Sequence, residues 1–185
     1  MHGRIKIVRV GQLTGDTENG IWNMSEAWPL MLSTAKELKC LPVIKQRLDW
    51  LPLDVAARAV VDLAFQRQEE KTQQVSVYHV VNSTEQNDWE DLLRWLKEIR
   101  DESFEVVEPG IWLDKLEALE SHPAKKLLWL WEKAFRNQNG MDSVELSVNR
   151  TMRASKALRE FIGVDEPLTR KIWAWLEDEI AEGQS

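Results

Sequence analysis

Two short runs of β-branched residues constrain this sequence more than any other feature. IKIVRV (5–10) is interpreted as a β-branched run that forms a short buried strand and ends at Gly11, and VSVYHVV (75–81) as a second strand. Such runs are typical of buried parallel strands, which need cover on both faces and neighbours on each side. SFEVVE (103–108) is a candidate third strand. Because so few strands leave open edges, the pattern indicates part of a larger sheet.

Most of the remaining chain has the spacing of amphipathic helices. Asn87 and Glu90 are spaced as a capping box at the start of one of them. In another, the predicted buried face comprises Leu53, Ala56, Ala57, Val60, Val61 and Ala64. The predicted helices cover 25–38, 53–65, a segment after Asn87, 111–119, a segment after Pro123, 149–162 and a last segment from Asp165.

The glycine-rich stretch RVGQLTGDTENGIW (9–22) is not typical of a nucleotide-phosphate loop. Its glycines lie at 11, 15 and 20, which is not the dinucleotide-binding spacing, and no Lys-Ser or Lys-Thr pair follows them. Asp16 and Glu18 would repel a phosphate, and Pro29 delays the following helix, so that no helix N-terminus meets the turn. The sequence therefore predicts no phosphate site here and no bound cofactor.

Composition and charge exclude several classes of partner. Of the 185 residues, 43% are hydrophobic and 30% charged, as in ordinary globular proteins, and the net charge is −7. Without a basic patch, we expect neither nucleic acid nor a membrane surface as a partner. The chain has no apolar run of spanning length, no secretory leader and one cysteine, so we predict a cytoplasmic protein without an intrachain disulfide.

Tryptophans and neighbouring acids are the candidate site residues. Ten tryptophans stand against one tyrosine, and indoles serve either as core anchors or as apolar ligand walls. A carboxylate against an indole wall would have a raised pKa and could act as acid or base, although a solvated or capping role is the alternative. The acids near these tryptophans are Asp16, Glu18, Glu26, Asp49 and Asp54. Gln12 would either bind a substrate carbonyl or satisfy the loop backbone.

The histidines and the cysteine favour structural roles. His79 alternates with valines on one strand and is interpreted as a core histidine, and His122 precedes a helix proline. Cys40 lies at a helix end rather than at the electropositive helix start that activates thiols. The spacing of these residues fits no metal site.

Several stretches resemble the later half of thioester reductase domains, which are extended short-chain dehydrogenase/reductases of the male-sterility type found in fungal peptide and polyketide synthetases. The first two are long and specific, and the others are weaker. The stretches are RVGQLTGDTENGIWNMSEAWPLMLSTAKELKCLP (9–42), LDWLPLDVAARAVVDL (48–63), VYHVVNS (77–83), WEDLL (89–93), IWLDKL (111–116), PAKKLLWLWEKAF (123–135) and RASKALREFIGVDEPL (153–168).

The resemblance implies a fold and a site. The fold is α/β, an incomplete Rossmann-type sheet of two or three short strands with a predominantly helical C-terminal region. We predict a single domain over 1–185, with the sheet remnant and a substrate loop in 1–82 and a helical substrate-side region in 83–185. In the family, the loop after the R-x-G-Q motif (here Arg9 to Gln12) walls the substrate cleft. The predicted substrate-binding residues are Gln12, Trp22, Trp28, Met31 and Trp50, and the predicted catalytic residues are Glu26 and Asp49.

The chain departs from the family at the catalytic centre. The phosphate-binding glycines of the first strand and the Tyr-x-x-x-Lys pair are absent, because the lone tyrosine is Tyr78 and residue 82 is Asn. Only MHGRIKI precedes the matching region. We therefore do not expect this chain to reduce a substrate by itself.

Three functions are consistent with these observations. The first, which we favour, is a stand-alone, cofactor-independent protein that performs a redox-neutral step, such as a cyclisation, cycloaddition or isomerisation, on a small apolar polyketide or peptide intermediate. The second is a fragment of an NADPH-dependent thioester reductase. The third is a non-catalytic module that docks an acyl or peptidyl carrier protein. The open sheet would be covered by a partner, by a homodimer or by rearrangement.

Overall fold

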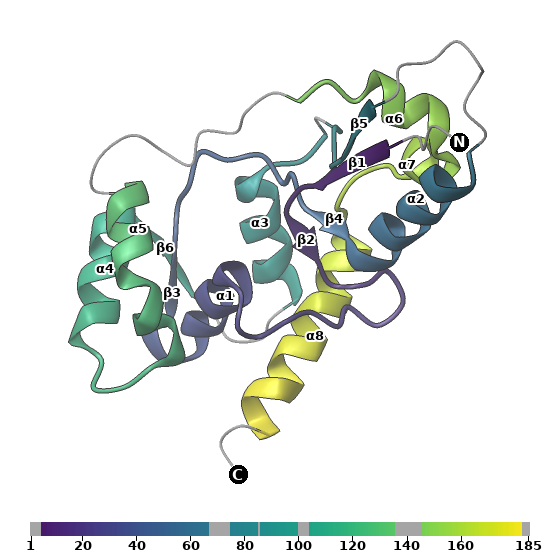
Figure 1. Cartoon of the computed structure of the whole chain (residues 1–185). Helices are drawn as coiled ribbons and strands as arrows, with labels where there is room; N and C mark the ends of the chain where they lie inside the picture. The colour runs from purple at the N-terminus through teal and green to yellow at the C-terminus, as the bar shows by residue number, and fades with distance from the viewer. Residues whose placement is uncertain (1–4, 67–74, 85, 100–103, 136–145, 183–185) are drawn as a thin grey trace.

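Short parallel strand pairs and many helices make up the fold. The computed structural model describes residues 5–66, 75–84, 86–99, 104–135 and 146–182. Within these residues, three two-stranded parallel sheets form, each from segments that are distant in the sequence (Figure 1). The pairs are β1 (Ile5–Val10) with β5 (Val75–Val80), β2 (Leu13–Thr14) with β4 (Leu51–Pro52), and β3 (Cys40–Pro42) with β6 (Glu105–Val107). This confirms the α/β class, and β2, β3 and β4 are short strands that the sequence pattern missed.

The helices lie where the periodicity predicted them, with two exceptions. The single helix predicted from Pro123 begins as a 3₁₀ helix and continues as an α-helix. The predicted helix 149–162 is two helices, because the Ser155 side chain accepts a hydrogen bond from the backbone of Leu158 and caps a new helix. The helices are α1 (Ala27–Leu38), α2 (Leu53–Phe65), α3 (Trp89–Ile99), α4 (Pro109–Ala118), the 3₁₀ helix η1 (Pro123–Leu127), α5 (Leu128–Phe135), α6 (Asn149–Ala154), α7 (Lys156–Glu160) and α8 (Glu166–Glu182). No helix in the described ranges has the length and apolar character needed to cross a membrane.

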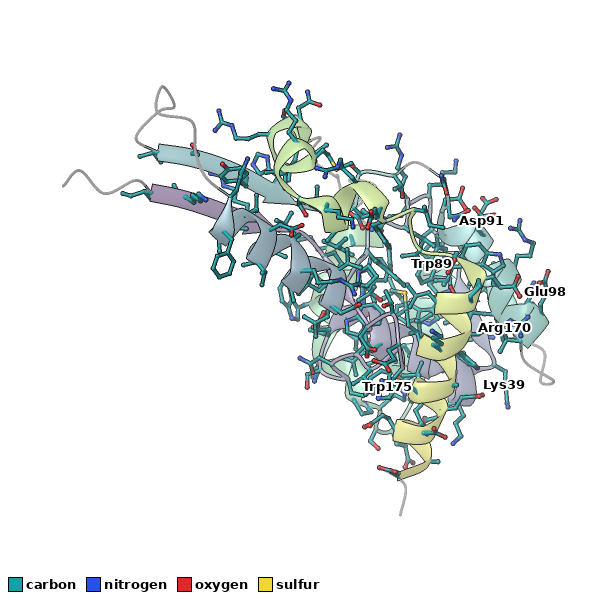
Figure 2. The ribbon with its side chains drawn as sticks, turned by 90° about the vertical axis from the view of Figure 1, so that its right-hand side faces the viewer. Lys39, Trp89, Asp91, Glu98, Arg170 and Trp175 are labelled. Atoms are coloured by element: carbon teal, nitrogen blue, oxygen red, sulfur yellow. The ribbon has the colours of Figure 1, made fainter. Side chains whose placement is uncertain are left out.

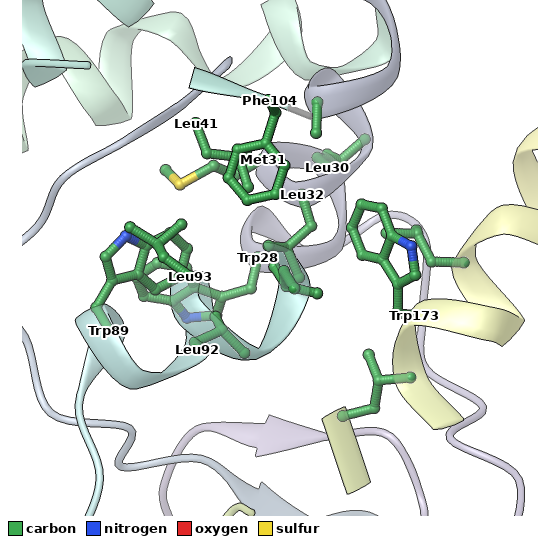
Figure 3. Packing of buried hydrophobic residues seen from close by; sticks show 14 of the residues in the cluster. Trp28, Leu30, Met31, Leu32, Leu41, Trp89, Leu92, Leu93, Phe104 and Trp173 are labelled. Atoms are coloured by element: carbon green, nitrogen blue, oxygen red, sulfur yellow. The ribbon is translucent and has the colours of Figure 1, made fainter. Parts of the chain in front are cut away.

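The buried residues form two clusters. The larger contains residues of α1, α3, α4, α5 and α8, and Trp28 and Trp89 are among them (Figure 3). The smaller lies between α2, β5 and α7, and includes Leu63 and Tyr78. The loop of residues 15–26 and α8 lie beside α2 and β2 (Figure 1).

The buried face of α2 differs from the predicted one. The buried side chains are Val55, Ala56, Ala59 and Leu63, so that only Ala56 of the predicted set is buried. Leu53, Val60 and Val61 are exposed, and Phe65 is 84% exposed. The prediction was wrong because the charged residues Asp54, Arg58 and Asp62 occupy only a narrow stripe of α2. The rest of the helix surface is apolar, so the sequence does not mark which part of it faces the sheet.

The β1–β5 sheet is also less covered than predicted. Continuous apolar runs predicted two buried faces, but Ile5, Ile7 and Val10 of β1 and Val75 of β5 are exposed. One face, carrying Tyr78 and Val80, packs against α2. Among the described residues, β1 pairs with β5 alone, so that its other edge presents unpaired backbone groups.

The cap of α3 is shifted by one residue from the predicted box. The Asp88 carboxylate accepts hydrogen bonds from the backbone of Glu90 and Asp91, and the Asp91 carboxylate accepts one from the backbone of Asp88. Asn87 instead donates its side-chain amide to the carbonyl of Val164, at 2.8 Å. The capping box is therefore Asp88 with Asp91, and Asn87 holds the segment before α8.

Candidate functional site

Three predicted site residues meet at one carboxylate. Glu26 precedes α1 and makes no side-chain hydrogen bond to that helix's backbone. Its Oε2 accepts a hydrogen bond from the Trp22 indole Nε1, at 3.2 Å, and another from the Gln12 side-chain amide, at 3.3 Å. The Gln12 amide also donates to the carbonyl of Leu13, at 2.8 Å. Gln12, Trp22 and Glu26 thus form one hydrogen-bonded group at the start of the substrate-side loop.

This group borders a groove with a volume of about 410 Å³. Trp22 and Glu26 line it together with Trp175 and Glu179 of α8. Figure 2 shows Trp175 on α8, the long helix that runs to the lower end of the molecule. Leu13, Ile21 and Leu53 add apolar surface. The arrangement suits a small ligand with both an apolar part and a polar group.

The other predicted substrate-binding residues lie in the core. Trp28, Met31 and Trp50 are at most 4% exposed and line neither this groove nor the larger one of about 840 Å³ beside α2 and α7. The Trp50 ring centroid lies 5.1 Å from that of Trp22 and 5.3 Å from that of Trp28, in edge-on and tilted arrangements. Trp28 in turn packs on Trp89 (Figure 3). These rings anchor the core behind Trp22, as the alternative interpretation of the tryptophans expected.

Asp49 is separate from the Glu26 group but has an unusual environment. The Asn82 side chain donates hydrogen bonds to the carbonyls of Leu48 and Trp50, which fixes the backbone on both sides of Asp49. The buried Oδ1 of Asp49 has no hydrogen-bond partner in the part of the chain that the structure describes. Burial raises the pKa of Asp49. The two predicted catalytic acids are therefore not brought together, and Asp49 lines neither groove.

The glycine loop is closed around its own backbone. Asp16 accepts hydrogen bonds from the backbone N–H groups of Glu18, Asn19 and Ile21, and these bonds lower the pKa of its carboxyl against the opposing effect of burial. A phosphate would need the same donors. The described residues thus do not fit the nucleotide part of a nicotinamide cofactor at this loop.

Asp54 also has a structural role. It accepts hydrogen bonds from the Thr17 backbone and hydroxyl and pairs with Arg58 at 2.7 Å. These interactions lower the pKa of Asp54, although burial acts in the opposite direction. Asp54 therefore joins the glycine loop to α2.

The histidines and the cysteine fit structural roles as well. His122 accepts a hydrogen bond from the backbone of Ala124 and caps η1, and burial lowers its pKa. The His79 Nδ1 lies 2.9 Å from the Ser147 carbonyl. Cys40 is buried, and burial raises the pKa of its thiol. Among the described residues, no three His, Cys, Asp or Glu side chains gather in a metal-holding group.

Sequence reasoning missed the α8 wall and Thr14. Trp175 and Glu179 are four residues apart on one helix face, but the spacing alone does not reveal that this face meets a loop more than a hundred residues earlier in the sequence. Thr14 is 1% exposed, lines the groove, and has a hydroxyl without a hydrogen-bond partner among the described residues. No signal in the sequence identified it.

Comparisons with known proteins find that the chain is similar to a small part of much longer fungal synthases and synthetases. No known protein-family profile matches it. It is 31% identical over 141 residues to a non-reducing polyketide synthase of Stachybotrys chartarum, across 74% of this chain and 5% of the synthase. It is 31% identical over 163 residues to a non-canonical non-ribosomal peptide synthetase of Acremonium egyptiacum, across 86% of this chain and 14% of the synthetase.

Solved structures that share the fold include two reductase domains. The terminal reductase domain of the myxalamid biosynthetic pathway matches with a TM-score of 0.74 and 21% identity, over 95% of this chain and 44% of that domain's chain. The reductase domain of a peptide synthetase from Mycobacterium tuberculosis matches with a TM-score of 0.72 and 16% identity, over 94% and 46%. The chain thus spans less than half of either solved domain. The resemblance seen in the sequence is confirmed.

Proposed function

Because this chain is similar in sequence and in fold to part of the reductase domains of polyketide and peptide synthetases, we propose that it is the substrate-side part of a thioester reductase. The nucleotide-binding part would be a separate segment docked on it. This is the second of the three functions considered from the sequence. The geometry favours it over the stand-alone enzyme because most of the predicted tryptophan pocket is filled core.

The uncovered apolar surface carries this proposal. Exposed hydrophobic side chains gather on β1, on β5 and on the outer side of α2. A parallel sheet normally has helices on both faces and a strand beyond each central strand. In the solved domains, more than half of the chain has no counterpart here. A nucleotide-binding segment that extends the β1 edge would cover these groups. The side chains are Ile5, Ile7, Val75, Leu53, Val60, Val61 and Phe65.

The chain's own residues would bind and orient the substrate. Glu26, held by Gln12 and Trp22, offers a fixed carboxylate beside the groove. Trp22 and Trp175 offer apolar walls. Because the glycine loop does not fit the nucleotide part of the cofactor, the cofactor and the proton donor would come from the docked segment. A carrier protein would present the thioester.

Complementation tests this proposal. The probe is the part of the myxalamid terminal reductase domain that has no counterpart in this chain, produced together with this chain. We expect a complex by size-exclusion chromatography and saturable NADPH binding by calorimetry for the complex, but no saturable binding to the chain alone up to millimolar NADPH. Val61→Asp in the apolar face should abolish the complex, whereas Glu177→Lys on α8 should not. Micromolar binding of NADPH to the chain alone, or failure of two folded parts to associate, would contradict the proposal.

A further inference from the structure

We propose that the groove between the loop of residues 13–26 and α8 binds a protonated amine, and that the substrate of the proposed reductase therefore carries an ammonium group beside an apolar part. The identification of this ligand as the substrate rests on the proposed function, but the amine site itself does not. It rests on four features of the groove, which are its carboxylates, its missing cations, an unpartnered hydroxyl and its indoles.

The charges of the groove are all negative. Glu26 lines it from the loop and Glu179 from α8, and none of the described lining residues is Lys or Arg. Neither carboxylate forms an ion pair with a described cation. Both donors to Glu26 bind Oε2, which leaves Oε1 without a hydrogen bond from the described residues. An ammonium ion in the groove would be attracted by these carboxylates, and a carboxylate or phosphate ligand would be repelled.

Thr14 supplies an independent sign of a polar ligand. Buried hydroxyls are nearly always hydrogen-bonded, because an unpaired one costs the desolvation of its dipole. Thr14 is almost fully buried in the wall of the groove, and its Oγ1 has no partner among the described residues. An ammonium N–H donor in the groove would satisfy this oxygen.

The aromatic walls suit the same ligand. Trp22 and Trp175 flank the groove from the loop and from α8. The faces of indole rings attract ammonium ions, and their apolar surface accepts the adjoining carbon atoms. Leu13 and Leu53 add aliphatic contact. The groove thus selects an amphipathic cation rather than the wholly apolar intermediate predicted from the sequence.

Binding to the chain alone tests the amine site. The probe is 2-phenylethylammonium, and 2-phenylethanol is its uncharged counterpart. In two-dimensional NMR spectra, we expect the ammonium to shift the indole N–H signals of Trp22 and Trp175 saturably, with a Kd at least tenfold lower than that of the alcohol. Equal affinities, or shifts confined to other tryptophans, would overturn the proposal.

Matched charge variants complete the test. Glu179→Gln should weaken ammonium binding about five- to tenfold without changing the affinity for the alcohol. Glu177→Gln removes the same charge from an exposed position on α8 outside the groove, and should leave both affinities unchanged. Equal effects of the two variants would show a non-specific response to net charge and would overturn the site. No nucleotide-binding part is needed, so failure here is distinguishable from failure of the proposed reductase role.

Discussion

At the scale of single residues, Gly20 determines how closely the glycine loop approaches α8. Its φ is +73°, a conformation that side chains other than glycine rarely adopt, and a Cβ there would lie 2.4 Å from the backbone nitrogen of Ile172. Gly15 is equally confined, because its Cβ would lie 2.3 Å from the carbonyl oxygen of Gly20. The glycines therefore serve loop packing, which in turn places Trp22 opposite Trp175.

We expect Gly20→Ala to destabilise the protein by about 2 kcal/mol or more, because it adds left-handed strain to a backbone clash. Urea unfolding followed by circular dichroism measures this. Gly110→Ala is the control, since nothing lies within 4 Å of a Cβ at that position in α4. That change should be neutral or stabilising by up to about 1 kcal/mol. Similar losses for both variants would refute the close approach.

The pH dependence of stability should report on Asp49. Burial raises its pKa in the folded chain, so that the folded chain binds more protons than the unfolded chain in the window between the ordinary and the raised pKa. The free energy of unfolding therefore falls as the pH rises through that window. Asp49→Asn removes this effect and should stabilise the protein at pH 7 by about 1 kcal/mol.

The stabilisation by Asp49→Asn should shrink at pH 4, where the wild-type carboxyl is more fully protonated. Urea unfolding of both proteins at the two pH values measures this. Asp178→Asn, at an exposed position on α8, is the control and should show little change at either pH. If the Asp49→Asn protein were less stable than wild type at pH 7, the charged form of Asp49 would be stabilised in the fold.

At the scale of elements, the start of α3 offers two possible capping boxes that look alike in sequence. NDWE and DWED each place an acid three residues after a capping residue, and the structure selects Asp88 with Asp91 because Asn87 bonds to Val164. That choice depends on a contact with a segment far along the chain. Local sequence therefore predicted the existence and start of α3 to within two residues but not its cap.

Asp88→Ala should destabilise the protein by about 1 kcal/mol, because two backbone N–H groups of α3 lose their acceptor. Thermal unfolding measures the change in Tm. Glu90→Ala, which removes the acid that the sequence pattern assigned to the box, should cost less. A larger effect of Glu90→Ala than of Asp88→Ala would restore the predicted box of Asn87 and Glu90.

The separation of the site residues along the sequence determined which parts of the candidate site were predictable. Gln12, Trp22 and Glu26 lie within fifteen residues of one another, so the resemblance of one stretch was enough to group them. The opposite wall, with Trp175 and Glu179, depends on the packing of α8 against the loop, which no local pattern encodes. Trp28 and Trp50 are of a residue type that suits a ligand wall. The burial of their side chains, however, is decided by how α1 and α3 pack.

At the scale of the whole molecule, the two core clusters differ in how completely they are covered. The larger cluster is enclosed by helices, including α8. Four tryptophans are almost fully buried in it, namely Trp50, Trp89, Trp112 and Trp131. The smaller cluster has β1, β5 and α2 around it, and the outward sides of these elements carry exposed apolar groups. Exposed apolar patches of this kind mark interaction surfaces more often than chance.

Phe65→Ser should leave the free energy of unfolding within about 0.5 kcal/mol of wild type, because Phe65 makes little contact with the core. It should also reduce concentration-dependent self-association, measured by light scattering after size-exclusion chromatography. Leu63→Ala, two residues earlier but buried, should cost about 2–5 kcal/mol. If Phe65→Ser were as destabilising as Leu63→Ala, the outer side of α2 would be covered within the chain.

The pairing of β1 with β5 has a consequence for the order of synthesis. Ile5 pairs with Val75 and Val10 with Val80, in parallel. While the protein is being translated, β1 leaves the ribosome long before its partner exists, and such distant pairings form slowly. A nascent chain that stops before Val80 therefore holds an apolar strand with both edges free. Translation pauses between α2 and β5 should lower the yield of folded protein, whereas pauses after β5 should be tolerated.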